Sequence, residues 1–200
     1  MPSLSAVSCS KSCGVGFGNA VLSLGKIGDS RSAETLAALQ STASPALRPI
    51  VAASICLVGL QCAEQETYLV ETLKASGREG QTQEIVRAAV TGLGALALAG
   101  RTSAAEALLA AGNQAPDSVR APVALATATV ALRNSALAFA LFEKAPSKDA
   151  LALVAEGFDM LEEDFEKEQF FALTRKTYWS AAEGSPTRSL MQTLIRELDF

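Results

Sequence analysis

The feature that most constrains this chain is a helix-turn-helix pattern in residues 22–39 that recurs further along. There an apolar helix end is followed by a Gly-Asp turn and then by a new amphipathic helix. The apolar positions of Leu24-Gly25-Lys26-Ile27 recur in Leu57-Val58-Gly59-Leu60 and in Leu93-Gly94-Ala95-Leu96, roughly 33 to 36 residues apart, a period typical of helical repeat proteins. A weaker fourth copy begins at Val119. The pattern predicts tandem helical hairpins with an extended surface.

One copy of this pattern carries a family resemblance. Leu24-Gly25-Lys26-Ile27-Gly28-Asp29-Ser30-Arg31 resembles the signature of HEAT-like repeats of the phycobilisome-lyase type. The next two copies replace the Gly-Asp turn with Gln61-Cys62-Ala63 and Ala99-Gly100-Arg101. The resemblance implies an α-α superhelix, a HEAT-like solenoid of about five helical hairpins. It also implies an alternative function, that of an accessory subunit of a bilin chromophore lyase.

Composition agrees with an all-α fold. Apolar residues make up 49% of the chain, enough for a sizeable core, and many of them are alanine, a strong helix former. Aromatic residues are only 6%, and no long segment alternates apolar and polar residues as a strand would. We expect a flexible N-terminal segment over residues 1–14 and a single HEAT-like repeat domain over residues 15–200, whose C-terminal cap comprises about residues 147–200.

Capping signals place about eleven helices along the chain. The Asp29 carboxylate is expected to cap a helix that starts at Ser30, and Gly77 and Gly100 are expected to close two others. The helices predicted individually span residues 15–27, 30–42, 45–60, 64–76, 82–99, 104–111, 118–132 and 187–198, and two more begin at residues 134 and 147.

The first helix takes the second-helix position of a repeat whose first helix is missing. One of its apolar faces therefore lacks its natural cover. Three alternatives remain open: the first dozen residues fold over this face, the chain is a fragment of a longer repeat protein, or another protein covers it.

The charge balance bears on partners and location. A net charge of -4, with 17 basic against 21 acidic residues, disfavours nucleic acid as a partner. The longest apolar stretches are shorter than the ~20 residues that span a bilayer, so no membrane segment is expected. The N-terminus has no basic region followed by a hydrophobic one, which predicts a cytoplasmic protein.

Several kinds of chemistry lack their residues. The chain has no histidine, which excludes Ser-His and Cys-His nucleophile pairs and every histidine-containing metal site. Its four cysteines lack the spacing of a zinc site and are interpreted as two tail thiols and two core thiols. The glycines of Gly14-Val15-Gly16-Phe17-Gly18 follow no strand, so they do not indicate a phosphate loop. We therefore expect neither an enzyme, nor a cofactor, nor a metal.

Three arginines fall near the starts of successive second helices: Arg48, Arg87 and Arg120. As a ladder on a concave face they would bind acidic side chains of a partner. As an internal ladder they would bond to an acid or a turn carbonyl of the adjacent repeat, with Glu84 and Asp117 as nearby acids. We favour the internal ladder, and keep all three as candidate partner-binding residues.

Aromatic residues gather in one C-terminal stretch. They either form a docking site or fill a loosely packed final layer. Phe158 and Phe165 are expected to share one helical face, which favours packing, whereas Tyr178 and Trp179 are expected to be an exposed, partner-binding pair. The acidic residues within 162–168 of this stretch are interpreted as a solvated helix junction. The stretch comprises Phe158, Phe165, Phe170, Phe171, Tyr178 and Trp179.

These observations predict a non-catalytic protein-protein interaction scaffold or adaptor. A repeat array offers contact area without needing a catalytic pocket. Its partner would be another protein or a second copy of the chain, and the sequence does not identify which.

Overall fold

The chain is helical throughout the part that the computed structural model describes, which comprises residues 11–76, 82–113, 115–144 and 147–200, with side chains from residue 16 onward. This part contains eleven α-helices, one short 3-10 helix and no strand, so the predicted all-α class is confirmed. The helices are α1 (Lys11–Ile27), α2 (Ser32–Thr42), α3 (Arg48–Val58), η1 (Cys62–Gln65), α4 (Glu66–Ala75), α5 (Gln83–Leu98), α6 (Thr102–Gly112), α7 (Asp117–Arg133), α8 (Ser135–Lys144), α9 (Lys148–Met160), α10 (Asp164–Ser180) and α11 (Pro186–Glu197).

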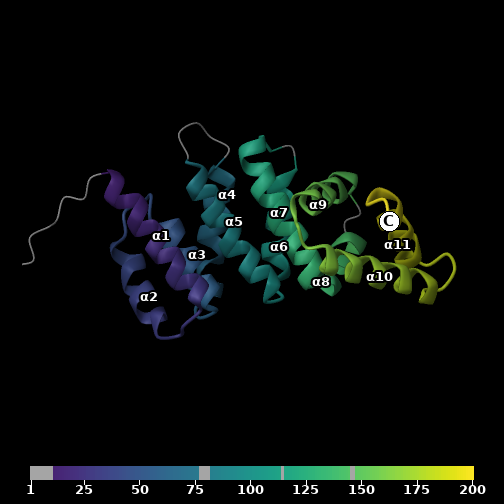
Figure 1. The fold of residues 1–200 in the computed structure, drawn as a ribbon, viewed down its shortest axis with the longest axis horizontal. Helices are drawn as coiled ribbons and strands as arrows, with labels where there is room; N and C mark the ends of the chain where they lie inside the picture. Colours follow the sequence, from purple (N-terminus) through teal and green to yellow (C-terminus); the bar gives the residue numbers. More distant parts are fainter. Residues whose placement is uncertain (1–10, 77–81, 114, 145–146) are drawn as a thin grey trace, which may run out of the picture.

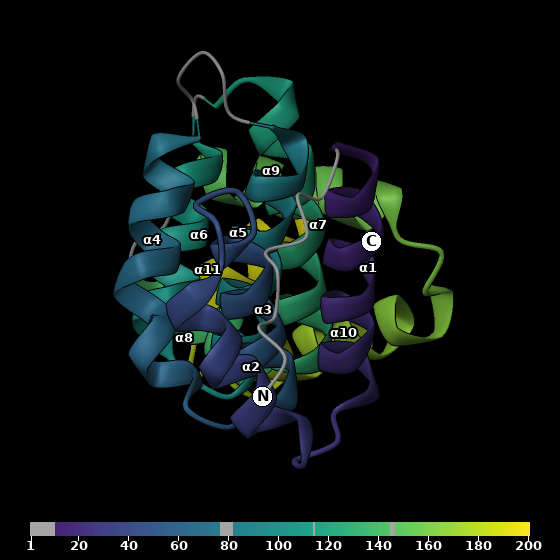
Figure 2. The ribbon, with the colours of Figure 1, turned by 90° about the vertical axis from the view of Figure 1, so that its left-hand side faces the viewer.

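The helices follow one another in sequence order along the long axis of the molecule (Figure 1), and most of them form two layers. In the first layer α3, α5, α7 and α9 contact one another in sequence order. In the second, α2, α4, α6 and α8 pack behind them, each against its neighbour in the first layer (Figure 2). Helices α1 and α10 lie on the opposite side of the first layer, against α3 and α7 respectively. Each short loop reverses the chain, so α3, α5 and α7 run in roughly the same direction.

Small residues at the helix contacts explain how the first layer packs so closely. Gly25 of α1 lies on α3, where an added Cβ would come 2.8 Å from the Ser54 Cα. Gly157 of α9 lies on α7 in the same way, and an added Cβ there would come 2.6 Å from the Ala128 Cβ. The core between the layers is correspondingly rich in alanine. Alanine therefore both favours the helices and lets their axes approach one another.

Helix ends follow the glycine signals at two of the predicted positions. Gly28 after α1 and Gly100 after α5 have positive φ angles of 70° and 90°, which glycine adopts without a steric penalty. Gly77, the other predicted helix end, lies outside the described residues.

The N-terminal boundary and the predicted Asp29 cap differ from expectation. Helix α1 begins at Lys11, inside the segment 1–14 that we expected to be flexible, and residues 1–10 lie outside the described part. Helix α2 begins at Ser32, and Asp29 does not cap it. Instead the Asp29 carboxylate accepts hydrogen bonds from the Arg31 backbone N–H, at 2.9 Å, and from the Arg31 guanidinium. The backbone makes one more tight turn before the helix, closed by a bond of 2.9 Å from the Ser32 N–H to the Asp29 carbonyl, and the Asp29 carboxylate is bonded within that turn.

The Asp29–Arg31 contact also changes the titration of both groups. Hydrogen bonding to Arg31 lowers the pKa of the Asp29 carboxyl below its ordinary value of 3.8. The contribution of this exposed pair to stability is therefore present above pH 3.8 and is lost as the pH falls through the lowered pKa.

The C-terminal aromatic stretch is divided between two helices. Helix α9 ends at Met160 and α10 begins at Asp164, because the chain is extended at Leu161, whose φ and ψ are -93° and 126°. Phe158 is buried and Phe165 is exposed, so the expectation that they share one helical face was wrong. The interpretation of acidic residues 162–168 as a helix junction holds only for Glu162 and Glu163, which lie between the two helices, where Glu163 pairs with Arg133 at 3.0 Å. Asp164, Glu166 and Glu168 belong to the first turns of α10.

The two core cysteines are joined in a disulfide, which corrects their interpretation as free thiols. Cys56 at the end of α3 is buried, and Cys62 at the start of η1 is half-buried and bonded to it six residues later. The pairing could not be predicted from the sequence, because Cys56 lies between the apolar residues Ile55 and Leu57 and is typical of a core residue. Disulfides are rare in the reducing cytosol, so this bond counts against the predicted cytoplasmic location.

Reduction of this bond should destabilise the protein measurably. A cross-link between residues six apart is expected to contribute about 2 kcal/mol by restricting the unfolded chain, so a reductant should lower the melting temperature by about 4 to 8 °C. The measurement is thermal unfolding followed by circular dichroism, with and without reductant. The Cys56→Ala/Cys62→Ala double variant is the control, since it keeps Cys9 and Cys13 and should not respond. Alkylation of both Cys56 and Cys62 in the unreduced protein would contradict the assignment.

No single described helix is long and apolar enough to cross a membrane. The bent pair α7 and α8, whose axes meet at 114°, passes that test only when the two helices are taken together.

Candidate functional site

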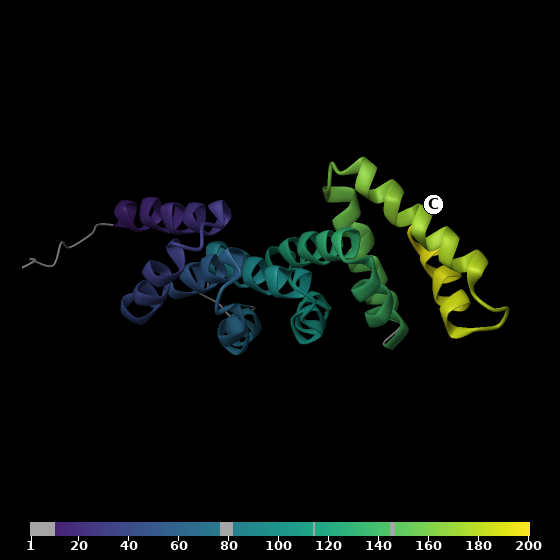
Figure 3. The ribbon, with the colours of Figure 1, turned by 90° about the horizontal axis from the view of Figure 1, so that it is seen from below.

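The face of the first layer between α1 and α10 is the candidate functional surface. Figure 3 shows α1 and α10 standing out from the same side of the array near its two ends, with α5 and α7 between them. Two hollows lie on this face. The middle of the first layer is thus left uncovered on this side by the described residues.

The first hollow, hollow A, follows the valley between α5 and α7 and has a volume of about 610 Å3. The second, hollow B, lies between α1, α3 and the first half of α5 and has a volume of about 640 Å3. Both are lined by Arg87 and Thr91, so the two hollows are neighbours that meet at α5. We call the two hollows together the groove. Hollow A is lined by Leu57, Gln83, Arg87, Val90, Thr91, Gly94, Ala95, Leu98, Ala121, Pro122, Leu125, Ala126, Thr129, Val130 and Met160.

The groove exposes large apolar side chains at one end. Leu98 of α5, Leu125 of α7 and Met160 of α9 are 39%, 39% and 42% exposed. They come from three helices but line the same hollow. These three side chains line one hollow instead of being scattered over the surface, so we take them as the candidate contact residues of this face.

The sequence contained a weak sign of this cluster. Residues of α5 at helical spacing, Arg87, Thr91, Gly94 and Leu98, form a face opposite to the one that α5 buries through Ala89 and its neighbours. A helix that is apolar nearly all round suggests complete burial, and residues 88–100 read that way. The exposed end of α5 was therefore missed.

The three candidate arginines have different surroundings. The Arg48 Nε donates to the Ala43 carbonyl at 3.1 Å, a bond to a turn carbonyl within one hairpin. Arg120 in α7 forms an ion pair with Glu156 in α9, its Nε lying 2.7 Å from the Glu156 Oε2, and also donates to the Gly112 carbonyl. Arg120 is thus an inter-helix contact, although its partner is neither of the two acids expected from the sequence.

Arg87 is the arginine that faces the groove. It is exposed, lines both hollows and forms no ion pair or side-chain hydrogen bond with another described residue. Of the three arginines, Arg87 is therefore the one whose guanidinium can bind a partner's carboxylate. Arg48 and Arg120 have bonds of their own.

Substitution of Arg120 and of Arg87 should separate these roles. Arg120→Ala removes a half-buried ion pair and a bond to Gly112, so we expect a loss of about 1 to 2 kcal/mol of unfolding free energy. Arg87→Ala removes no ion pair or hydrogen bond with a described residue and should change the unfolding free energy by less than about 0.5 kcal/mol. Urea unfolding of both variants measures the difference. Equal destabilisation by the two substitutions would show that Arg87 is also a structural residue.

The aromatic candidates are also separated by the structure. Trp179 is 74% exposed, but Tyr178 is half-buried against the C-terminal core, and the Arg188 guanidinium lies 4.9 Å from the centre of its ring. The expected exposed pair is therefore only one residue, Trp179. Tyr178 is turned inward because α10 packs on α11 at this point.

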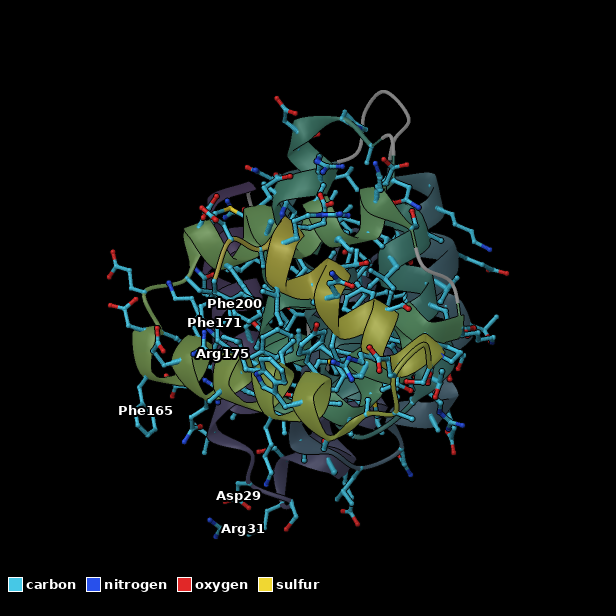
Figure 4. The ribbon with its side chains drawn as sticks, turned by 90° about the vertical axis from the view of Figure 1, so that its right-hand side faces the viewer. Asp29, Arg31, Phe165, Phe171, Arg175 and Phe200 are labelled. Carbon is cyan, nitrogen blue, oxygen red and sulfur yellow. A yellow bond between two sulfur atoms is a disulfide. The ribbon has the colours of Figure 1, made fainter. Side chains whose placement is uncertain are left out.

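The other C-terminal aromatic residues mostly pack together. Phe171 stacks on Phe200, with ring centres 3.9 Å apart, and the Arg175 guanidinium lies over the Phe200 ring (Figure 4). Phe165 points away from this cluster into solvent. Packing thus accounts for most of the aromatic stretch, and Phe165 and Trp179 are the exceptions.

The first helix also exposes apolar side chains. Phe17, Leu24 and Ile27 are exposed on α1, while Val21 and Gly25 face α3. None of the described segments covers this side of α1.

No protein-family model, curated protein or solved structure matches this chain. Function must therefore be argued from the groove and its residues.

Proposed function

We propose that this chain is a non-catalytic interaction scaffold of HEAT-like repeats that binds a partner protein in the groove. The serial contacts of α3, α5, α7 and α9, backed by α2, α4, α6 and α8, support a repeat array, because each unit contacts mainly its neighbours. A superhelical, HEAT-like course of this array is part of the proposal.

The observation that carries the proposal is the groove itself. It comprises two neighbouring hollows that extend over three or more helices, and it leaves Leu98, Leu125 and Met160 partly exposed to solvent. Covering such side chains removes apolar surface from water, which favours association by about 25 cal/mol per Å2. The surface is long and shallow, which fits a protein segment better than a small molecule enclosed in a pocket.

Photo-crosslinking from inside the groove tests this function. A photoreactive amino acid is placed at Leu125 in the full chain, and at Glu71, an exposed residue of α4 in the second layer, as the control. In the native host, a specific protein should crosslink at Leu125 and not at Glu71, and mass spectrometry identifies it.

A matched pair of substitutions completes the test. Leu125→Lys should abolish recovery of that protein, because a charge replaces an apolar contact, and Glu71→Lys should leave it unchanged. Crosslinks that are the same at both positions, or recovery that is insensitive to Leu125→Lys, would reject the groove as the binding surface.

A further inference from the structure

The inner surface of hollow A combines small residues with a few large ones. The valley is lined by small residues of both helices: Gly94 and Ala95 on α5, and Ala121 and Ala126 on α7. The two helices approach closely here, since a Cβ added at Gly94 would lie 3.8 Å from the Ala126 Cβ. Small residues let a third helix approach a helix pair closely. The larger Leu98, Leu125 and Met160 would then flank it.

The molecule already uses this mode of packing on the same face. Helix α1 lies on α3 through Gly25, whose contact is the backbone of Ser54, and α10 lies on the same side against α7. Figure 3 shows these two helices at either end, with α5 and α7 between them. A helix in the valley would continue that outer row from α1 to α10.

An extended peptide would fit this valley poorly. The backbone groups of α5 and α7 are used in their own helices, and the valley lining is mainly apolar. The N–H and C=O groups on the side of an extended segment that faces the valley would lose water and find no partners there, which costs free energy. A helix satisfies these groups internally and presents only side chains.

The charges along the valley set a direction. Among the described residues that line hollow A, Arg87 alone has a charged side chain, and it lies near the N-terminal end of α5. The parallel α5 and α7 add partial positive charge at this end and partial negative charge at their C-terminal ends. The exposed Asp159 precedes Met160 at the other end of the valley, and Glu162 follows it closely. Glu84 also lies near Arg87, but it lines hollow B only.

We infer that hollow A binds an amphipathic α-helix of a partner protein, antiparallel to α5 and α7, with an acidic residue in its C-terminal half paired with Arg87. This orientation places the partner's positive N-terminal end near Asp159 and its acidic residue near the guanidinium. The valley follows all 16 residues of α5, about 24 Å, so it accommodates a helix of about 15 residues. The inference rests on the proposed function and names its partner's chemistry.

A random peptide library tests the occupant. Peptides of about 15 residues are displayed on phage and selected for binding to the full, folded chain. The expected sequences carry apolar residues at positions i, i+3 or i+4, and i+7, and Asp or Glu in the C-terminal half. Selected peptides that lack this period, that contain proline throughout, or that are not enriched at all would overturn the inference.

Charge reversal tests the contact with Arg87. Arg87→Glu should weaken binding of a selected acidic peptide about tenfold. The same variant should bind normally a peptide in which lysine replaces that acid. Leu125→Lys should lower the affinity for both peptides at least about tenfold, whereas Glu71→Lys on α4 should leave both affinities unchanged. Unchanged affinity in Arg87→Glu would overturn the pairing.

The direction is read from crosslinking with a benzophenone at the peptide's N-terminus. Attachment near Met160 supports the antiparallel orientation, and attachment near Gln83 overturns it. Failure of this inference is distinguishable from failure of the proposed function. A native partner that crosslinks at Leu125 through a non-helical segment would contradict the helical ligand but not the scaffold function. The absence of any crosslink at Leu125 would contradict the scaffold function itself.

Discussion

Phe170→Ala should be among the most destabilising substitutions in this protein, with an expected loss of about 3 to 5 kcal/mol of unfolding free energy. Phe170 is 1% exposed in α10, and its ring contacts Phe139 of α8 at 5.5 Å and Phe158 of α9 at 5.4 Å between ring centres. Its removal leaves a cavity where α10 joins the rest of the array. At about 2 to 4 °C per kcal/mol, the melting temperature should fall by 6 °C or more.

Phe165→Ala provides the matched control for this substitution. It removes the same side chain from the same helix, but Phe165 is 71% exposed, so the expected change is less than about 0.5 kcal/mol. Differential scanning calorimetry of the two variants compares them directly. A small effect of Phe170→Ala would mean that the α10–α11 hairpin is not packed on α8 and α9 as described.

Gly157→Ala should also destabilise the protein, by about 3 kcal/mol, although alanine is normally the better helix former. The added methyl group would collide with the Ala124 carbonyl on α7 and lie 2.6 Å from the Ala128 Cβ. Backbone atoms cannot move aside as a flexible side chain can, so α7 and α9 would have to separate. Urea unfolding at equilibrium measures the loss.

Gly94→Ala distinguishes this clash from a general effect of glycine replacement. Gly94 is also inside a helix of the first layer, but its nearest contact for a new Cβ is 3.8 Å away, at Ala126. Gly94→Ala should therefore stabilise the protein by about 0.5 to 1 kcal/mol. If both substitutions had the same sign, the close approach of α7 and α9 would not be the cause.

The candidate site was only partly visible in the sequence. The regular placement of three arginines suggested a ladder, but the residues themselves gave no sign of which one lacks a partner. Arg120 is bonded to Glu156, which lies 36 positions later, and Arg87 has no described partner. Such pairings depend on which helices become neighbours, and no local pattern encodes that. The exposed Leu125 and Met160 were missed for the same reason.

What the sequence by itself determined is the helical content and most helix ends. Helix propensity, apolar spacing and the glycines at residues 28 and 100 act within a few residues of one another, so they can be read along the chain. Only the tertiary structure decided which apolar faces are buried. It places Phe158 inside and Phe165 outside, joins Cys56 to Cys62, and puts no described segment over the valley between α5 and α7. These outcomes follow from contacts between helices that are distant in sequence, where the free energy depends on which neighbour arrives and how closely it packs.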